Sequence, residues 1–252
     1  ECDANALAIK ASEGAGASSA QAFNKLSKCM PDRAKRIASE AISKFVPGKP
    51  TNKALVSAIE LGFEDDVATW LEAQQSDEKT QAMRALGNKC AENKTVQGFF
   101  LSQAETQGDD FWKIRWFKYL DQCPVPEITD MLGKKVVESK DGARNIYFGV
   151  MTVYARVAGV EALPILETHL GGSDDEKVQM QILEAFSYAA KVGSEEGTDQ
   201  ATAAKAAKII VASASGMSSK ALAQARKSLI AMGDEESADS LAAHSYSALA
   251  QN

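Results

Sequence analysis

The feature that most constrains the fold is an aromatic-rich stretch between positions 109 and 123. It opens with two aspartates, which suit the positive end of a helix. A helix that is apolar around most of its circumference needs neighbours on several sides. The stretch therefore predicts a helix at residues 109–122, packed inside a larger helical assembly. Seven large apolar side chains occupy the eleven positions after the first aspartate, namely Phe111, Trp112, Ile114, Trp116, Phe117, Tyr119 and Leu120.

Similar segments recur at a regular spacing. Four of them start at Ser76, Gly108, Lys140 and Ser173, which are 32, 32 and 33 residues apart. Each start is followed by an aspartate that can cap a helix N-terminus, and then by an apolar stripe. A period of this length built from two helices is typical of an α-solenoid, in which each hairpin buries its apolar side against the next one.

The pattern Asp-x-x-x-Val/Ile-Gln/Arg resembles the first helix of HEAT repeats. It is clearest at Asp174–Phe186 and at Asp110–Arg115, and the resemblance covers roughly residues 50–250. It implies an all-α fold, a right-handed α-α superhelix of about five to six helical hairpins. The repeats are shorter than the family norm, and the Pro and Arg positions of that family are only partly kept. The tetratricopeptide alternative ranks second because its Trp, Gly-Tyr and Pro signature is missing.

The apolar periodicity predicts helices throughout and no strands. We expect an N-terminal helical cap at residues 1–50 and a HEAT-like solenoid at 51–252, together one continuous domain. The second helices of the hairpins, 64–74, 93–106, 127–139, 160–170 and 198–212, are expected to line the concave side. The predicted helices are 4–11, 19–29, 32–46, 52–61, 64–74, 77–89, 93–106, 109–122, 127–139, 141–157, 160–170, 174–192, 198–212, 218–232 and 235–250.

The four cysteines fit this register. Cys90 and Cys123 are 33 residues apart, one repeat, and follow the apolar stripes of two successive helices. Equivalent ends of adjacent helices lie about 10 Å apart, and loop residues could close that gap to a disulfide. We expect Cys2 to pair with Cys29 in the same way and to fasten the N-terminus. The alternative is four buried free thiols.

Composition limits the classes of partner. The net charge is −6, which disfavours binding to nucleic acid or to an anionic membrane. No apolar run reaches the roughly 18–20 residues of a transmembrane helix. The chain begins at Glu1 without a methionine, so either a targeting segment has been removed or the sequence has been trimmed. Together with the cysteines, this favours a periplasmic or secreted protein.

We find no catalytic constellation in the sequence. The chain has no Walker phosphate loop, and neither His169 nor His244 belongs to a recognisable triad. Acidic groups such as Asp174, Asp175 and Glu176 stand at helix starts and lack the spacing of a calcium loop. We therefore predict no catalytic residue, no metal site and no cofactor.

Two clusters invite sharper hypotheses. Some HEAT-like DNA glycosylases use aromatic and acidic residues in a basic groove, and Trp112, Arg115 and Trp116 invite that comparison. Core packing explains the aromatic residues better, and we expect Arg115 to lie on a narrow polar stripe with Lys118. The densest basic cluster contains Lys134, Lys135, Lys140 and Arg144. It is explained by a solvated face or by contact with an acidic partner.

The hypothesis that best fits the sequence is a non-enzymatic exported scaffold that binds a protein or peptide. An enzyme of the lyase type or a small-molecule binder, with a pocket near Phe99, Phe100, Trp112 and Tyr147, is the alternative. A nucleic-acid binder is the weakest of the three. The candidate binding surface comprises Trp70, Phe99, Phe100, Lys134 and Lys135.

Overall fold

The computed structural model describes residues 2–12, 17–42, 52–72, 80–191 and 197–250. Within these ranges the chain is helical and no segment forms a β-strand, as the sequence predicted. Two compact units are present, Glu1–Cys123 and Pro124–Asn252, and each has its own core. The predicted division at residues 50 and 51 stays a prediction.

The N-terminal unit begins with a small helical group. Helices α1 (Ala4–Ser12), α2 (Ala17–Cys29) and α3 (Pro31–Ile42) pack together. The helices predicted at 4–11 and 19–29 are confirmed, and so is the described part of the one predicted at 32–46. Their shared core contains Ala8, Leu26 and Ala34. The disulfide between Cys2 and Cys29, with Cα atoms 6.2 Å apart, fastens the start of the chain to the end of α2.

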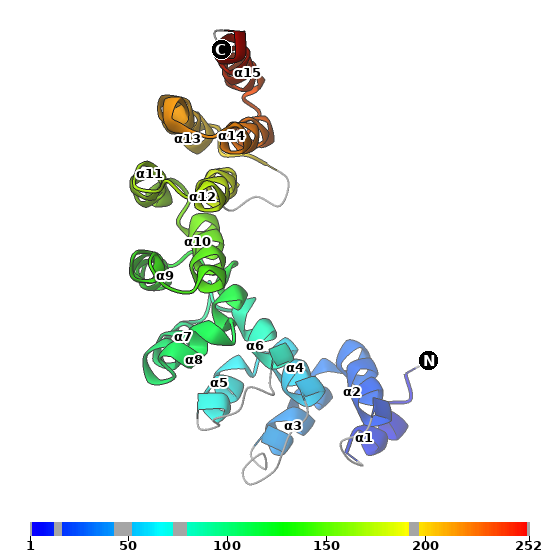
Figure 1. The fold of residues 1–252 in the computed structure, drawn as a ribbon. Helices are drawn as coiled ribbons and strands as arrows, with labels where there is room; N and C mark the ends of the chain where they lie inside the picture. Colours follow the sequence, from blue (N-terminus) through cyan, green and yellow to red (C-terminus); the bar gives the residue numbers. More distant parts are fainter. Residues whose placement is uncertain (1, 13–16, 43–51, 73–79, 192–196, 251–252) are drawn as a thin grey trace. The chain divides into compact units, whose positions relative to one another are not determined.

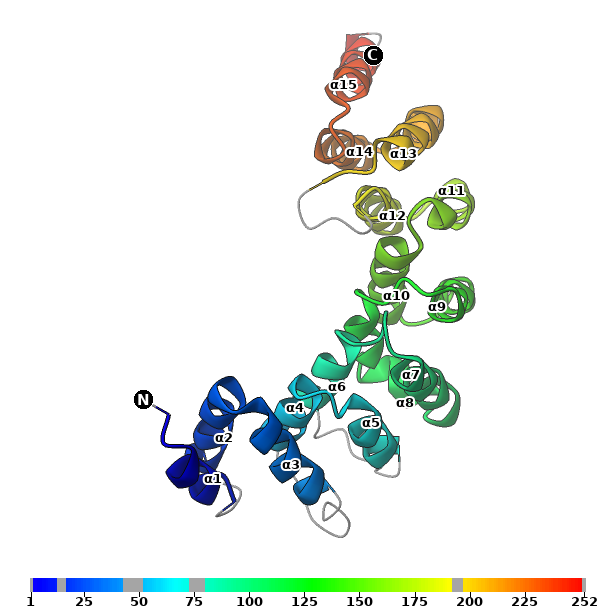
Figure 2. The same cartoon turned by 180° about the vertical axis from the view of Figure 1, so that it is seen from behind.

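The rest of this unit is built from two layers of helices (Figures 1 and 2). Helices α4 (Asn52–Glu60) and α6 (Thr80–Gly87) continue the layer of α2, while α5 (Glu64–Glu72) and α7 (Lys94–Thr106) pack against each other in the second layer. Asn93 caps α7 by accepting a hydrogen bond from the amide of Val96 at 3.0 Å. Parts of the helices predicted at 32–46, 64–74, 77–89 and 174–192 lie outside the described residues.

The predicted helix at 109–122 is wrong in one respect, because it is broken at Arg115. Helix α8 (Asp109–Lys113) stops there, and a 3-10 helix, η2 (Trp116–Leu120), follows. Arg115 has a φ of 64°, and it is the one non-glycine residue with positive φ in the described part of the chain. Such a conformation costs about 1–2 kcal/mol.

Packing explains this break. Seven apolar side chains on one continuous helix would surround it, and the core cannot cover every side. The turn at Arg115 redirects the chain, and five of the seven become buried while Ile114 stays 40% exposed. The rings of Phe111 and Trp112 then meet edge to face with centroids 4.9 Å apart. The buried five are Phe111, Trp112, Trp116, Phe117 and Leu120.

The C-terminal unit also has two layers (Figures 1 and 2). Helices α10 (Arg144–Ala158), α12 (Glu176–Ala189) and α14 (Ser219–Ala231) lie side by side in one layer. Helices α9 (Pro126–Ser139), α11 (Leu163–Gly171) and α13 (Gln200–Ser213) form the other layer, and α15 (Glu235–Ala250) packs on α14. Short 3-10 turns, η3 (Gly159–Ala162) and η4 (Ala214–Gly216), follow α10 and α13.

One helical stretch, Arg144–Gly171, is long and apolar enough to span a membrane by composition alone. It comprises α10, η3 and α11, and 61% of its apolar window is buried inside the protein. Gly159, with a φ of 56°, interrupts it. The apolar side chains of this stretch therefore have a place in the core of the unit.

Candidate functional site

Helices α10, α12 and α14 present equivalent outward faces. The N-cap residue of α12, Asp175, follows that of α10, Ala143, by 32 residues, and the N-cap residue of α14, Ser218, follows Asp175 by 43 residues. The exposed and half-buried side chains on the outward sides of these three helices form what we call the α10–α12–α14 face. They are Asn145, Phe148, Thr152 and Arg156; Lys177, Met180, Gln181, Glu184 and Tyr188; Leu222, Ala223, Arg226, Lys227 and Ile230.

A polar network joins α10 to α12 across this face. The amide of Gln181 donates to Thr152 Oγ1 at 3.4 Å and to Glu184 Oε2 at 3.3 Å. The Tyr188 hydroxyl donates to Glu184 Oε1 at 2.9 Å. The guanidinium of Arg156 lies 4.7 Å from the centre of the Tyr188 ring, in cation–π geometry. Both oxygens of Glu184 are thus occupied within the protein.

The pKa of Tyr188 is raised above its ordinary value. Partial burial contributes most, and the hydrogen bond to the Glu184 carboxylate adds to it. The phenol therefore stays protonated at neutral pH and remains a donor to Glu184. As a result, the side chains of Arg156, Tyr188 and Glu184 hold one another in position on an exposed surface.

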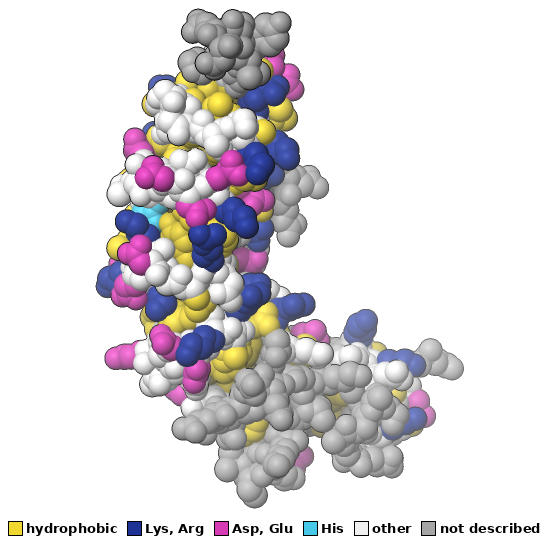
Figure 3. Space-filling model, viewed as in Figure 1, with side chains coloured by type: hydrophobic (Ala, Val, Ile, Leu, Met, Phe, Trp, Pro, Cys, Tyr) yellow, Lys and Arg dark blue, Asp and Glu magenta, His cyan; other side chains and the backbone are white. Residues whose placement is uncertain are grey.

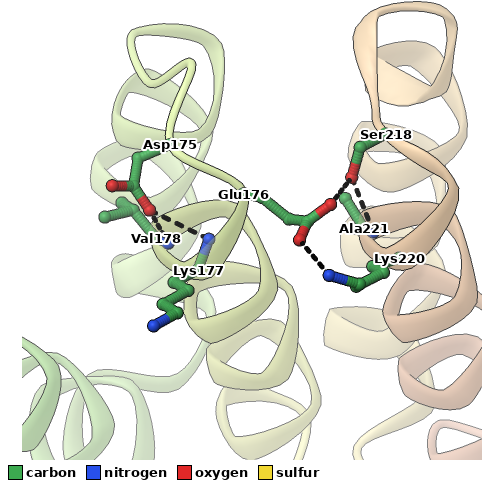
Figure 4. A network of polar contacts seen from close by, with 7 residues as sticks. All are labelled: Asp175, Glu176, Lys177, Val178, Ser218, Lys220 and Ala221. Atoms are coloured by element: carbon green, nitrogen blue, oxygen red, sulfur yellow. Dashed lines mark hydrogen bonds and ion pairs between the residues drawn. The ribbon is translucent and has the colours of Figure 1, made fainter.

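A second network joins the N-termini of α12 and α14 (Figure 4). Asp175 caps α12 by accepting hydrogen bonds from the amides of Lys177 at 2.9 Å and Val178 at 3.2 Å. Glu176 accepts from Ser218 Oγ at 2.6 Å and from Lys220 Nζ at 3.0 Å. These contacts align the start of α14 with the start of α12.

The carboxylates of this second network are held in the charged form. The backbone hydrogen bond from Val178 is the largest cause of the lowered pKa of Asp175, and the ion pair with Arg144 adds to it. The hydrogen bonds from Ser218 and then Lys220 lower the pKa of Glu176. Both carboxylates are accessible to solvent, so the network fixes geometry and adds little stability.

Two buried polar side chains, Tyr147 and His169, contact each other in the C-terminal unit. The hydroxyl oxygen of Tyr147 is 2.5 Å from Nδ1 of His169, and both side chains are buried. When His169 is neutral and Nδ1 carries no proton, the Tyr147 hydroxyl donates to it. Burial lowers the pKa of His169, with a further lowering from Lys140, and burial raises the pKa of Tyr147 to about 12. The sequence placed His169 in no recognisable triad, and its burial against Tyr147 fits a structural role.

This pair gives a pH-dependent prediction. The native state favours neutral His169, whereas in the unfolded chain the group titrates near 6.5. The unfolded state therefore binds more protons as the pH falls below 6.5, and the native state loses stability there. We expect the difference in unfolding free energy between wild type and His169→Gln to decrease below pH 6.5. Urea unfolding followed by circular dichroism at a series of pH values measures the unfolding free energy of both proteins. A difference between them that stays constant or grows as the pH falls would contradict the prediction.

The predicted binding surface needs correction. Trp70, Phe99 and Phe100 are core residues with exposed fractions of 8%, 3% and 0%. Their helical spacing, which indicated an apolar face, reflects packing between α5, α7 and their neighbours, so these rings are closed to a partner. Lys134 and Lys135 lie on α9 in the C-terminal unit, where Lys134 is exposed.

The predicted basic cluster is partly neutralised within the protein. Lys135 lies 3.6 Å from Glu138, one helical turn away, and Arg144 pairs with Asp175. Of the residues expected near a pocket, Phe99, Phe100 and Trp112 are buried in the N-terminal unit and Tyr147 is buried in the C-terminal unit. The pocket hypothesis stays a prediction. In the described ranges, no three His, Cys, Asp or Glu side chains are grouped so that they could hold a metal ion.

The repeat pattern at the helix starts did not reveal the α10–α12–α14 face. The same 32-residue offset, continued along the helices, aligns Phe148 with Met180 and Arg156 with Tyr188, which was the available signal. Searches against family models, curated proteins and solved structures found no match to this chain.

Proposed function

We propose that the chain is an exported HEAT-like scaffold, a right-handed superhelix of helical hairpins, that binds a protein or peptide partner without catalysing a reaction. The observation that carries the proposal is the α10–α12–α14 face. It combines half-buried apolar side chains with a pre-arranged Arg–Tyr–Glu network, a composition typical of the core and rim of protein interfaces.

Contacts one hairpin apart support the repeat architecture. In the N-terminal unit, Asn93 Nδ2 donates to Asp65 Oδ1 at 2.7 Å across 28 residues. Ser57 Oγ donates to Asn24 Oδ1 at 3.2 Å across 33 residues. Polar contacts of this separation set the register between successive units, as expected if stability is summed over neighbouring hairpins.

The proposed surface differs from the sequence-based expectation. That expectation placed the binding surface on the second helices of the hairpins, such as 127–139 and 160–170. We assign it to the first helices because their outward side chains form a connected network. Export is supported by the two disulfides, since such bonds persist in oxidising compartments.

Photo-cross-linking in the cells that produce the protein tests this function. A benzophenone amino acid replaces Phe148 or Gln181 on the α10–α12–α14 face, and Asp130 or Glu167 on α9 and α11 in the matched controls. All four positions are exposed or half-buried, so each variant should fold. We expect the first two positions to yield the same protein adduct several-fold more strongly than the controls. Equal adducts at all four positions, or none at any, would refute binding at this face.

A further inference from the structure

The helices that carry the α10–α12–α14 face are more basic than the helices of the opposite layer of the C-terminal unit. Helices α10, α12 and α14 carry six arginines and lysines but two glutamates. In the opposite layer, α9, α11 and α13 carry four lysines and four acidic residues. The whole chain has 34 acidic and 28 basic residues. Of the two helical layers compared, the one that carries the face therefore holds the excess of positive charge.

The two glutamates of this layer have internal partners. Glu184 accepts hydrogen bonds from Tyr188 and Gln181, and Glu176 accepts from Ser218 and Lys220. Figure 4 shows the Lys177 side chain directed away from the Glu176 network. Arg144 pairs with Asp175 and Lys220 with Glu176, and the other basic side chains of these helices are Arg156, Lys177, Arg226 and Lys227.

Arg156 is suited to carboxylate recognition. Its guanidinium lies against the Tyr188 ring, which reduces the entropy lost when it binds a ligand. Its planar fork matches a carboxylate in bidentate geometry.

Apolar side chains run alongside these charges. Phe148, Met180 and Leu222 occupy half-buried positions on the three helices, and Ile230 is 54% exposed. In Figure 3, hydrophobic side chains lie among basic and acidic ones on the described surface of the C-terminal unit. A ligand that covers this face would meet both cations and apolar surface.

We propose that the α10–α12–α14 face binds an acidic segment of a partner protein, in which glutamates or aspartates alternate with large apolar residues. This inference rests on the proposed scaffold function and names the chemistry of its partner. Charge complementarity selects this ligand. The net charge of −6 repels duplex nucleic acid and anionic membranes as a whole, whereas a short acidic segment contacts only the local positive surface.

Fluorescence anisotropy tests the inference with a labelled peptide rich in Glu and Leu. Its counterpart has each Glu replaced by Gln. We expect the intact chain to bind the Glu peptide saturably at about 50 mM salt, more weakly at higher salt, and to bind the Gln peptide much less. The double variant Lys177→Glu/Lys227→Glu should weaken binding about five- to tenfold.

The matched control is Lys134→Glu/Lys208→Glu on the opposite layer. It changes the net charge equally and also alters exposed lysines, and we expect less than about a twofold loss because these charges lie away from the face. Equal losses in both variants, absence of saturable binding, or preference for anionic vesicles or duplex DNA over the peptide would overturn the proposal.

The two proposals fail in different ways. A partner cross-linked at Phe148 through a neutral or basic segment would refute the acidic ligand and leave the scaffold intact. Saturable peptide binding without any cross-linked protein at Phe148 or Gln181 would refute the scaffold function at this face, and the site would then bind an acidic ligand that is not a protein.

Discussion

Removal of the Cys90–Cys123 disulfide is expected to lower the unfolding free energy of the N-terminal unit by about 3–4 kcal/mol. The bond closes a loop of sequence separation 33, and the loss of loop entropy in the unfolded chain accounts for an effect of this size. Both cysteines are fully buried, with Cα atoms 5.3 Å apart. The bridge joins the segment after α6 to the segment after η2, where two successive helical pairs meet.

Tryptophan fluorescence isolates this effect. All three tryptophans, Trp70, Trp112 and Trp116, lie in the N-terminal unit, so their emission during urea unfolding reports on that unit. The variant Cys90→Ala/Cys123→Ala should unfold at a markedly lower urea concentration. Alanine is preferred to serine because a hydroxyl would be buried at both positions.

The second disulfide provides the control. The variant Cys2→Ala/Cys29→Ala removes a bridge whose cysteines are both exposed, and it keeps the buried bridge. A reductant should therefore destabilise this variant by the same amount that separates wild type from Cys90→Ala/Cys123→Ala. A loss below about 1 kcal/mol on removal of the buried bridge, with the slope of unfolding unchanged, would contradict the entropic argument.

The sequence predicted the helices and both disulfides because these depend on local patterns. The apolar periodicity predicted the helix starts of the C-terminal unit to within a few positions. The expected aspartate caps were wrong in detail, because Gly108, Ala143 and Asp175 occupy the N-cap positions in place of Asp109, Asp141 and Asp174. The separation between Cys90 and Cys123 matched the repeat, and the repeat predicted which segments would be neighbours.

The break at Arg115 and the location of the candidate surface could not be predicted in this way. Seven apolar residues in eleven positions are compatible with a straight helix, and only the space available around Phe111 and Phe117 makes a left-handed residue at 115 favourable. Similarly, the spacing of Phe99 and Phe100 indicates an apolar face without showing what covers it. The Arg156–Tyr188 contact requires two helices to be aligned in space, which periodicity alone does not establish.

Replacement of Gly87 by alanine is expected to destabilise the N-terminal unit by about 3 kcal/mol. Gly87 is the buried last residue of α6, and a Cβ atom there would overlap the backbone carbonyl oxygen of Tyr119 in η2. It would also lie 2.9 Å from the Tyr119 carbonyl carbon and from its Cβ. Because the obstacle is backbone, relief requires α6 and η2 to separate, and the Cys90–Cys123 bond close by restrains that movement.

Gly98→Ala in α7 is the matched control, since Gly98 is exposed and a Cβ atom added there would have no neighbouring atom within 4 Å. Alanine favours a helix interior over glycine by about 0.8–1 kcal/mol, so we expect Gly98→Ala to stabilise the unit. Gly87 is the last residue of α6, where the propensity gain is smaller than in a helix interior, and the overlap with Tyr119 outweighs it. Urea unfolding followed by tryptophan fluorescence should therefore shift in opposite directions for the two variants. Equal shifts would mean that α6 does not contact η2 as closely as the glycine at 87 permits. Without the Cys90–Cys123 bond the two helices can separate more freely. We therefore expect Gly87→Ala to lower the unfolding free energy by a smaller amount in the variant that lacks this bond.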